Sequence, residues 1–126
     1  MPEAIKYSSY KDLIVYQKAK ALTLEVFRYF AKPKLPRVYE FLIIQLLRAA
    51  SSIGANIVEG YGRHYKKSYR QFLGVARGSC FETDYWLELV FELKIFNNEI
   101  VADFIEKNKE LVKMLTAMMK KLEQRT

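Results

Sequence analysis

Apolar residues recur along this chain at the spacing of an α-helix, in four segments that short polar breaks separate. Positions i, i+3, i+4 and i+7 share one face of a helix with about 3.6 residues per turn. The first segment shows this spacing most clearly, at Val15, Ala19, Leu22, Val26 and Phe30. No Asn-Gly dipeptide of the kind that joins β-hairpins lies between alternating segments. The pattern therefore predicts four helices and no sheet.

The breaks between the segments contain residues that end or begin helices. The sequence KPKLP (residues 32–36) ends the first helix because proline has no backbone N–H, and Pro36 suits the first turn of the second. Ser68 and Asn98 are candidate N-caps for the third and fourth helices. We expect one domain over residues 1–126, with helices at about 11–31, 37–61, 69–96 and 99–122. Short connections predict an all-α, antiparallel up-down-up-down four-helix bundle.

The third and fourth helices each have a predicted inner face. In the third helix it is Phe72, Val75, Ala76, Ser79, Trp86, Val90 and Leu93. In the fourth helix it is Ile100, Phe104, Leu111, Leu115, Met118 and Leu122. With 126 residues, of which 51% are hydrophobic, the chain is long and apolar enough to bury a core.

Residues 45–63, QLLRAASSIGANIVEGYGR, differ from an ordinary surface helix because nearly every position outside one narrow polar stripe is apolar or small. Gly54 within such a helix costs about 1 kcal/mol relative to alanine, which the close approach of another helix would offset. The small residues favour tight packing, either within one protomer or against a neighbouring subunit. We favour the second interpretation, because a bundle helix needs only one broad apolar face.

Six polar residues of the second and third helices are predicted to form a structural network. They are Arg48, Ser52, Asn56, Glu59, Ser79 and Glu82. Glu82 falls toward the apolar side of its helix, where a carboxylate needs a cation, and Arg48 can supply one. The alternative is a catalytic pair of Glu59 and Glu82, but no nucleophile, base or phosphate-binding loop accompanies them. The sequence therefore predicts no enzymatic activity, no cofactor and no metal site.

Charge is distributed unevenly around a net value of +7. Residues 60–81 contain five Lys or Arg and no Asp or Glu, whereas residues 82–104 contain six acids and one lysine. The acidic stretch is either a solvated face or the surface that meets the basic residues of an adjacent subunit.

The basic stretch is a candidate nucleic-acid-binding site. Its candidate residues are Arg63, His64, Tyr65, Lys66, Lys67, Arg70 and Arg77. Lysine and arginine neutralise phosphates, and tyrosine and histidine rings stack on unpaired bases. Arg70 and Arg77 are seven residues apart and are expected on the outer face of the third helix. The alternative interpretation is a solvated loop that keeps the protein soluble.

Two further features limit the chemistry and the location. Cys80 is the only cysteine, which excludes an internal disulfide and a cysteine-based metal cage. The N-terminal residues lack the apolar segment of a secretory signal, and no uncharged run approaches the length of a membrane span. We expect a soluble, cytoplasmic protein with no membrane partner.

Three sequence segments together resemble one known family. They are YKDLIVYQKA (residues 10–19), QLLRAASSIGANIVEGYGR (residues 45–63) and SYRQFLGVARGSCFE (residues 68–82). Over about residues 10–96 the chain is similar to the small four-helix-bundle proteins of the 23S rRNA intervening-sequence family. It departs from that family at Leu47, where a second arginine usually precedes Ala49.

The resemblance implies a bundle that assembles into a ring-like homo-oligomer, typically a homopentamer. Some relatives are encoded within inserts of 23S rRNA genes. Distant relatives are the accessory variability determinant proteins of diversity-generating retroelements, which bind nucleic acid and a reverse transcriptase. We therefore expect a non-enzymatic, homo-oligomeric protein that binds nucleic acid, RNA more readily than DNA, and acts with an rRNA intervening sequence or a retroelement. The alternative is an interaction scaffold that docks an acidic partner such as a reverse transcriptase.

Overall fold

The computed structural model describes residues 9–31 and 34–124, and every regular element in these ranges is helical. A short 3-10 helix, η1 (Tyr10–Asp12), precedes four long helices. These are α2 (Ile14–Phe30), α3 (Arg37–Gly62), α4 (Lys66–Leu93) and α5 (Asn98–Gln124). The predicted all-α fold is confirmed. Residues 32 and 33 of the predicted first break lie outside the described ranges.

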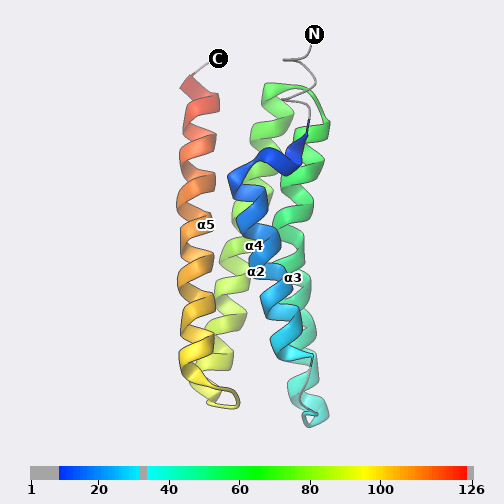
Figure 1. The fold of residues 1–126 in the computed structure, drawn as a ribbon, viewed down its shortest axis with the longest axis vertical. Coiled ribbons are helices and arrows are strands. Elements are labelled where there is room, and N and C mark those ends of the chain that lie inside the picture. The colour runs from blue at the N-terminus through cyan, green and yellow to red at the C-terminus, as the bar shows by residue number, and fades with distance from the viewer. Residues whose placement is uncertain (1–8, 32–33, 125–126) are drawn as a thin grey trace.

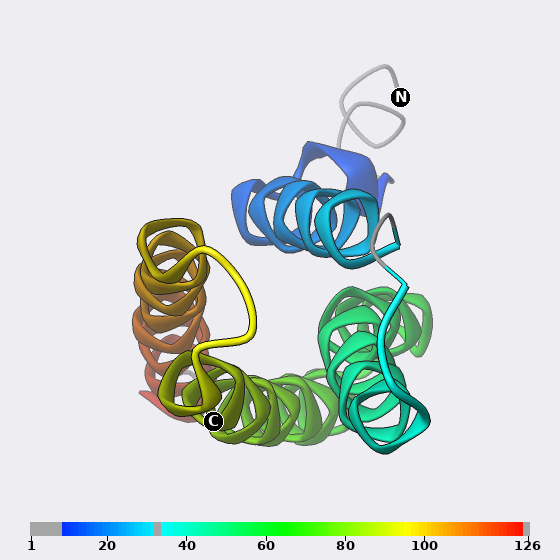
Figure 2. The ribbon, with the colours of Figure 1, turned by 90° about the horizontal axis from the view of Figure 1, so that it is seen from below.

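The helices run alternately up and down, and each packs beside its neighbours in the chain (Figure 1). Viewed along the bundle, α2 lies opposite α4 and α3 lies opposite α5 (Figure 2). The seams of α4 with α3 and with α5 are the most extensive, and the seam between α2 and α5 is thinner. The α3–α4 hairpin and the last turns of α5 therefore lie at the same end of the bundle (Figure 1).

Three of the predicted helix starts were wrong by one to three residues, because α2 begins at Ile14, α4 at Lys66 and α5 at Asn98. The predicted end of the third helix at residue 96 was also wrong, since α4 ends at Leu93. Helix α4 begins at Lys66 with Tyr65 in the N-cap position, so Ser68 lies inside the first turn. Asn97 rather than Asn98 caps α5, because its Oδ1 accepts hydrogen bonds from the backbone N–H groups of Glu99 (3.0 Å) and Ile100 (3.1 Å).

The core lies along the axis between all four helices. The predicted inner face of α2 is buried at each of its five positions. In α3 the buried residues are Leu42, Ile43, Leu46, Ala49, Ala50, Ile53, Ile57 and Gly60. In α5 they are Val101, Phe104, Ile105, Asn108, Leu111 and Leu115. The prediction of Ile100 as core was wrong, since this side chain is 37% exposed, and Met118 and Leu122 are only partly buried.

The buried face of α4 differs from the predicted one. It consists of Leu73, Ala76, Cys80, Thr83, Leu87 and Val90. Val75 and Leu93 were wrongly predicted as core, because they are 51% and 47% exposed. Phe72, Ser79 and Trp86 are partly buried and face α3. Helix α4 packs on both α3 and α5, so its most buried line points between these two helices rather than toward α3 alone.

Helices α3 and α4 approach each other closely at Gly60. A Cβ atom at this position would lie 2.6 Å from the Cβ of Phe72, so only glycine fits without a shift of the helices. At Gly54 the corresponding Cβ would lie 3.9 Å from the Cβ of Ala19, which is ordinary van der Waals contact. The expectation that Gly54 permits close approach was therefore wrong, and Gly60 has that role.

Helix α3 is long and apolar enough, by those two criteria alone, to cross a membrane. The core helix of a soluble protein passes the same test, and 39% of the most apolar window of α3 is buried inside the bundle. Three large apolar residues of α3 point outward, namely Val38, Phe41 and Ile44, which are 72%, 61% and 60% exposed. Helix α3 thus has one apolar face in the core and a second one that its own protomer leaves uncovered.

Candidate nucleic-acid interface

The α3–α4 hairpin presents five of the seven candidate residues to solvent, and Arg63 is one of them. His64, Tyr65, Lys66 and Lys67 are all exposed, and the Tyr65 side chain is 73% exposed. Neither lysine forms an ion pair with a described carboxylate. These two ammonium groups are therefore available to an anionic ligand.

The local backbone of this hairpin is unusual for the residues that form it. His64 has a φ of 74°, which lies in the left-handed region. This conformation is energetically unfavourable for any residue that has a Cβ atom. Tyr65 is extended in the N-cap position, and no side chain caps α4. The first turn of α4 then contains Lys66 and Lys67 and no acidic residue, although the N-terminus of a helix carries partial positive charge.

Arg63, the first of the candidate arginines, is held at the end of α3. Its guanidinium forms an ion pair with Glu59 at 2.9 Å and lies over the ring of Phe72, 5.0 Å from the ring centroid. Both side chains of the ion pair are about half exposed. Arg63 is thus partly neutralised within its own protomer.

Arg70 and Arg77 point toward α5 and not, as predicted, away from the bundle. Arg70 forms an ion pair with Glu123 at 3.0 Å, and its Nε donates to the backbone oxygen of Met119 at 3.3 Å. The Nε of Arg77 donates to Oγ1 of Thr116 at 2.8 Å. The prediction was wrong because α4 has packed neighbours on two sides, so the line of Arg70 and Arg77 borders the α4–α5 seam.

Most tyrosines near this end contact one another and are unavailable as stacking surfaces. The ring of Tyr10 lies 4.9 Å from that of Tyr16 and 6.5 Å from that of Tyr61, which in turn lies 6.1 Å from that of Tyr69. Burial, with a smaller contribution from Tyr61, raises the pKa of the Tyr69 hydroxyl above its ordinary value. Tyr65, the tyrosine among the candidate residues, has instead a largely exposed ring.

Three lysines that the sequence analysis did not single out lie at the same end of the bundle. Lys11 is in η1, beside the tyrosine that contacts the end of α3. Lys120 and Lys121 are exposed in the last turns of α5, which pack beside the first turns of α4 (Figure 1). The only sequence signal for the two α5 lysines is the basic excess of the C-terminal residues. We call these lysines together with the exposed hairpin residues His64, Tyr65, Lys66 and Lys67 the basic end.

The predicted polar network is present in part. The hydroxyl groups of Ser52 and Ser79 form a hydrogen bond of 2.9 Å across the α3–α4 seam, and Nδ2 of Asn56 donates to Oγ of Ser52 at 2.9 Å. Arg48 and Glu82 approach each other at 3.8 Å, but their side chains are 70% and 46% exposed. The expectation of a buried pair was therefore wrong.

The two carboxylates that could have formed a catalytic pair lie in separate places. Glu59 pairs with Arg63, and Glu82 lies beside Arg48 and accepts a hydrogen bond from Nε1 of Trp86 at 3.2 Å. The two arginines are separated by about 22 Å along α3 at the ordinary helical rise. No group of three or more His, Cys, Asp or Glu residues in the described ranges could hold a metal ion.

Cys80 is fully buried in the α4 core. Burial raises the pKa of its thiol to about 12, and the nearby Arg77 charge opposes this rise only in part. The thiol is therefore protonated at neutral pH and has the environment of a structural cysteine.

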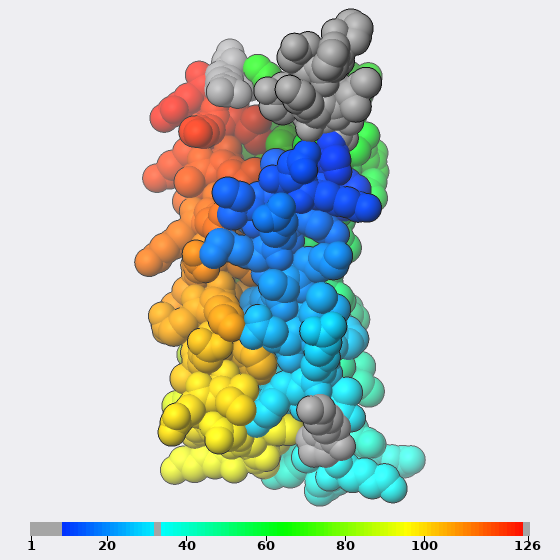
Figure 3. Space-filling view, in the orientation of Figure 1, coloured from blue at the N-terminus to red at the C-terminus, as the bar shows by residue number. Residues whose placement is uncertain are grey.

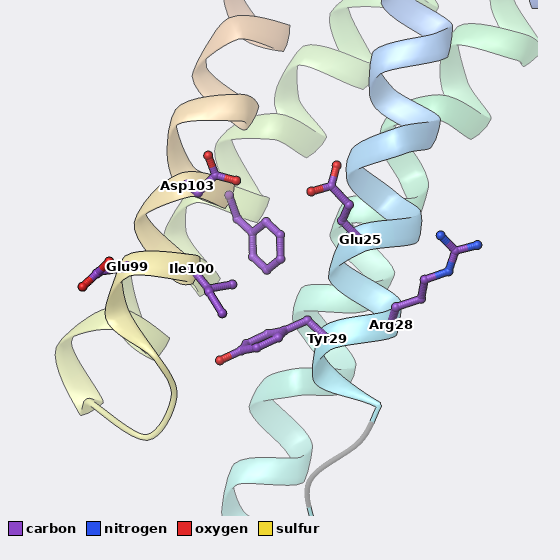
Figure 4. A pocket seen from close by; sticks show the side chains of 7 residues that line it. Glu25, Arg28, Tyr29, Glu99, Ile100 and Asp103 are labelled. Atoms are coloured by element: carbon purple, nitrogen blue, oxygen red, sulfur yellow. The ribbon is translucent and has the colours of Figure 1, made fainter.

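A hollow of about 520 Å³ lies between α2 and α5, away from the basic end (Figure 4). Carboxylates of Glu25, Glu99 and Asp103 line it together with the ring of Tyr29. Lys107 binds two of these carboxylates, Glu25 at 2.7 Å and Asp103 at 3.0 Å. A smaller hollow of about 160 Å³ on the same seam is lined by residues that include Lys18 and Glu110. Elsewhere on the face that Figure 3 shows, atoms of α2 and α5 are in contact. The acidic lining makes the larger hollow unsuited to a polyanion.

A second exposed surface lies along α3 and α4, on the side of the bundle opposite the hollow between α2 and α5 (Figure 2). Its residues are Val38, Phe41, Ile44, Tyr85 and Trp86, which we call the aromatic face. The ring of Trp86 lies 6.5 Å from that of Phe41 and 5.1 Å from that of Tyr85. Exposed apolar patches of this kind mark interaction surfaces in soluble proteins.

The fold and these surfaces define an antiparallel four-helix-bundle protein with one basic end and an uncovered aromatic face. The chain matches the family described as 23S rRNA-intervening sequence protein over residues 11–117, and it belongs to that family. It is similar in structure to a protein of unknown function from the S23 ribosomal protein family of Bacteroides thetaiotaomicron, with a TM-score of 0.76 and 24% sequence identity. That match covers 85% of this chain and 99% of the other. A comparison with curated proteins gave no match.

Proposed function

We propose that this protein binds RNA through its basic end, without catalysing a reaction, and that several copies assemble into a ring. The observation that carries the proposal is the collection of locally unfavourable features at the α3–α4 hairpin. Folded proteins tend to retain such features at functional sites, where a ligand compensates for them.

Three of these features oppose folding in the absence of a ligand. The left-handed conformation of His64 costs of order 1–2 kcal/mol. The first turn of α4 has no side-chain cap, and two lysines lie where the helix macrodipole disfavours cations. A phosphate group beside Lys66 and Lys67 would reverse the electrostatic part of this cost. The same arrangement has no evident benefit for a solvated loop.

The chemistry of the basic end suits an RNA strand with unpaired bases. Lys66 and Lys67 are mobile point charges that neutralise phosphates without requiring one fixed geometry. The exposed ring of Tyr65 lies between them and His64 in the chain and offers a surface on which a base stacks. The family description, 23S rRNA-intervening sequence protein, also favours RNA over DNA and supports a link to an rRNA insert. A retroelement is the second setting that we consider.

Assembly through the aromatic face would strengthen this binding. Phe41 and Ile44 on α3 and Tyr85 on α4 are 61%, 60% and 56% exposed, which is costly for large apolar groups in water. A second copy that covers them would remove this surface from water. A closed ring would present several basic ends to one RNA, so that weak contacts combine into useful affinity. Sedimentation velocity of the wild type and of Phe41→Glu tests this step, with a ring expected for the first and smaller species for the second.

The binding site is tested by fluorescence anisotropy with a labelled oligouridine at low salt. We compare the wild type with the double variant Lys66→Gln/Lys67→Gln. The matched control is Arg37→Gln/Lys94→Gln, which removes the same charge at the other end of the bundle. We expect weaker binding for the first variant and unchanged binding for the control. Equal weakening by both variants would mean that total charge, and not the basic end, determines binding. Equal affinity of all three proteins would favour the alternative of a scaffold for an acidic protein.

A further inference from the structure

Arg77 differs from Arg48, Arg63 and Arg70 because it is held in place without a carboxylate partner. Arg48, Arg63 and Arg70 each pair with a glutamate. Arg77 instead donates from Nε to Oγ1 of Thr116 at 2.8 Å. Its guanidinium carbon lies 4.9 Å from the centroid of the exposed Phe81 ring.

Thr116 is itself fixed, which makes the position of Arg77 well determined. Its hydroxyl donates to the backbone oxygen of Val112 at 2.7 Å, so its lone pair faces the Nε of Arg77. This contact uses one of the five N–H groups of the guanidinium. The terminal amino groups donate to no residue in the described ranges. A planar guanidinium held by its Nε and one face presents these amino groups as a pair, which is the geometry that binds phosphate in a bidentate manner.

The surface beside Arg77 leaves room for a ligand. Gly78 is the next residue of α4, and a Cβ atom there would meet nothing within 4 Å. Glycine within a helix costs about 1 kcal/mol relative to alanine, and the packing of the protomer gives no reason for it here. A bare backbone next to an unpaired guanidinium permits close approach of a ligand's own backbone.

We propose that Arg77, positioned by Thr116 and Phe81 beside Gly78, forms a preformed phosphate subsite that extends the RNA interface from the basic end onto the α4–α5 face. The inference rests on the proposed RNA-binding function. Arg77 lies about 10 Å along α4 from Arg70 at the ordinary helical rise. Lys113 and Lys120 lie on the same side of α5 as Thr116, because they are three and four residues from it.

The charge around this subsite favours a polyanion over the acidic surface of a second copy. Glu123, a carboxylate on the α4–α5 seam, is already paired with Arg70. Asp84 lies two turns from Arg77 on the same side of α4, about 10 Å along the helix. Glu110 of α5 faces α2, where it pairs with Lys18 at 3.1 Å. Lys113 and Lys120 form no ion pair with a described carboxylate, so they add positive charge near Arg77 that the phosphates of one strand can follow.

The test uses the salt dependence of oligouridine binding by the full chain. Each phosphate contact to a single strand contributes about 0.7 to the slope of log affinity against log salt. We expect Arg77→Gln to reduce the slope by about 0.7. The matched control Arg28→Gln, an exposed arginine at the other end of the bundle, should leave it unchanged. Arg77→Lys and Thr116→Val keep the charge, so they should lower the affinity several-fold while the slope stays close to that of the wild type.

Each alternative outcome is distinguishable from failure of the proposed function. Unchanged binding by Arg77→Gln, with lost binding by Lys66→Gln/Lys67→Gln, would overturn the subsite and leave the basic end intact. A smaller sedimentation coefficient for Arg77→Gln, without a change in slope, would show that a carboxylate of a second copy occupies the position instead. Absence of oligouridine binding by the wild type would remove both proposals. Thermal melts by circular dichroism confirm that each variant is folded before its binding is compared.

Discussion

Neutralising Lys66 and Lys67 should make the protein more stable while weakening its binding to RNA. Both lysines lie in the first turn of α4, where the helix macrodipole disfavours positive charge and no acidic residue compensates. The interaction of one exposed charge with a helix end is worth about 0.3–1 kcal/mol, so Lys66→Gln/Lys67→Gln should raise the free energy of unfolding by about 0.6–2 kcal/mol. For a domain of this size the melting temperature should rise by roughly 2–8 °C.

The assay is thermal unfolding followed by circular dichroism at low salt and at one fixed protein concentration. The control is Lys94→Gln at the C-terminal end of the same helix, where a cation is favourable and its removal should lower the melting temperature. High salt should remove most of both changes, because exposed charges are then screened. A lower melting temperature for the double variant would refute this reasoning. So would a gain that high salt leaves intact, since it would have a cause other than the helix end.

Three further predictions concern the interior and the α3–α4 seam. Gly60→Ala should lower the free energy of unfolding in urea by about 1–3 kcal/mol, because the new Cβ would lie 2.6 Å from that of Phe72. Gly54→Ala should leave this free energy unchanged or raise it by up to about 1 kcal/mol. Equal effects of the two substitutions would contradict the helix spacing. Arg48→Leu should cost less than about 1 kcal/mol because its pair with Glu82 is exposed, and a loss of several kcal/mol would restore the buried pair expected from the sequence. Cys80 should resist alkylation by iodoacetamide at neutral pH until the protein unfolds, because burial raises the pKa of its thiol to about 12. Rapid labelling of the folded protein would contradict this burial.

The same pKa shift sets the direction of one pH effect. The Cys80 thiol ionises near 9 when exposed and near 12 when folded, so the folded state holds the proton more tightly. The thiol therefore contributes no pH dependence to stability well below pH 9, and stability should fall as the pH rises from about 9 toward 12.

The four helices could be predicted from the sequence because apolar periodicity and helix-breaking residues agree along most of the chain. The five core positions of α2 follow the pattern of one amphipathic face and were all correct. Helix α4 was harder, because it packs against two helices and carries large apolar residues on both flanks. Periodicity alone does not distinguish Val75, which is exposed, from Leu73, which is buried.

The candidate site could be predicted only where its residues are contiguous in the chain. The hairpin from His64 to Lys67 is exposed as expected. The partners of Arg70 and Arg77 lie on α5, about 40 to 50 residues away, and nothing in the local sequence indicates them. The left-handed conformation of His64 was equally hidden, because histidine has no strong preference that marks it. These details depend on how the helices dock, which one sequence does not specify.

The most direct test of the central claim is the salt dependence of RNA binding by the wild type and by Lys66→Gln/Lys67→Gln. Two lost phosphate contacts should reduce the slope of log affinity against log salt by about 1.4 for each engaged protomer. We predict this shallower slope together with weaker binding at low salt. Parallel lines of equal affinity for the two proteins would contradict the claim that the basic end binds RNA.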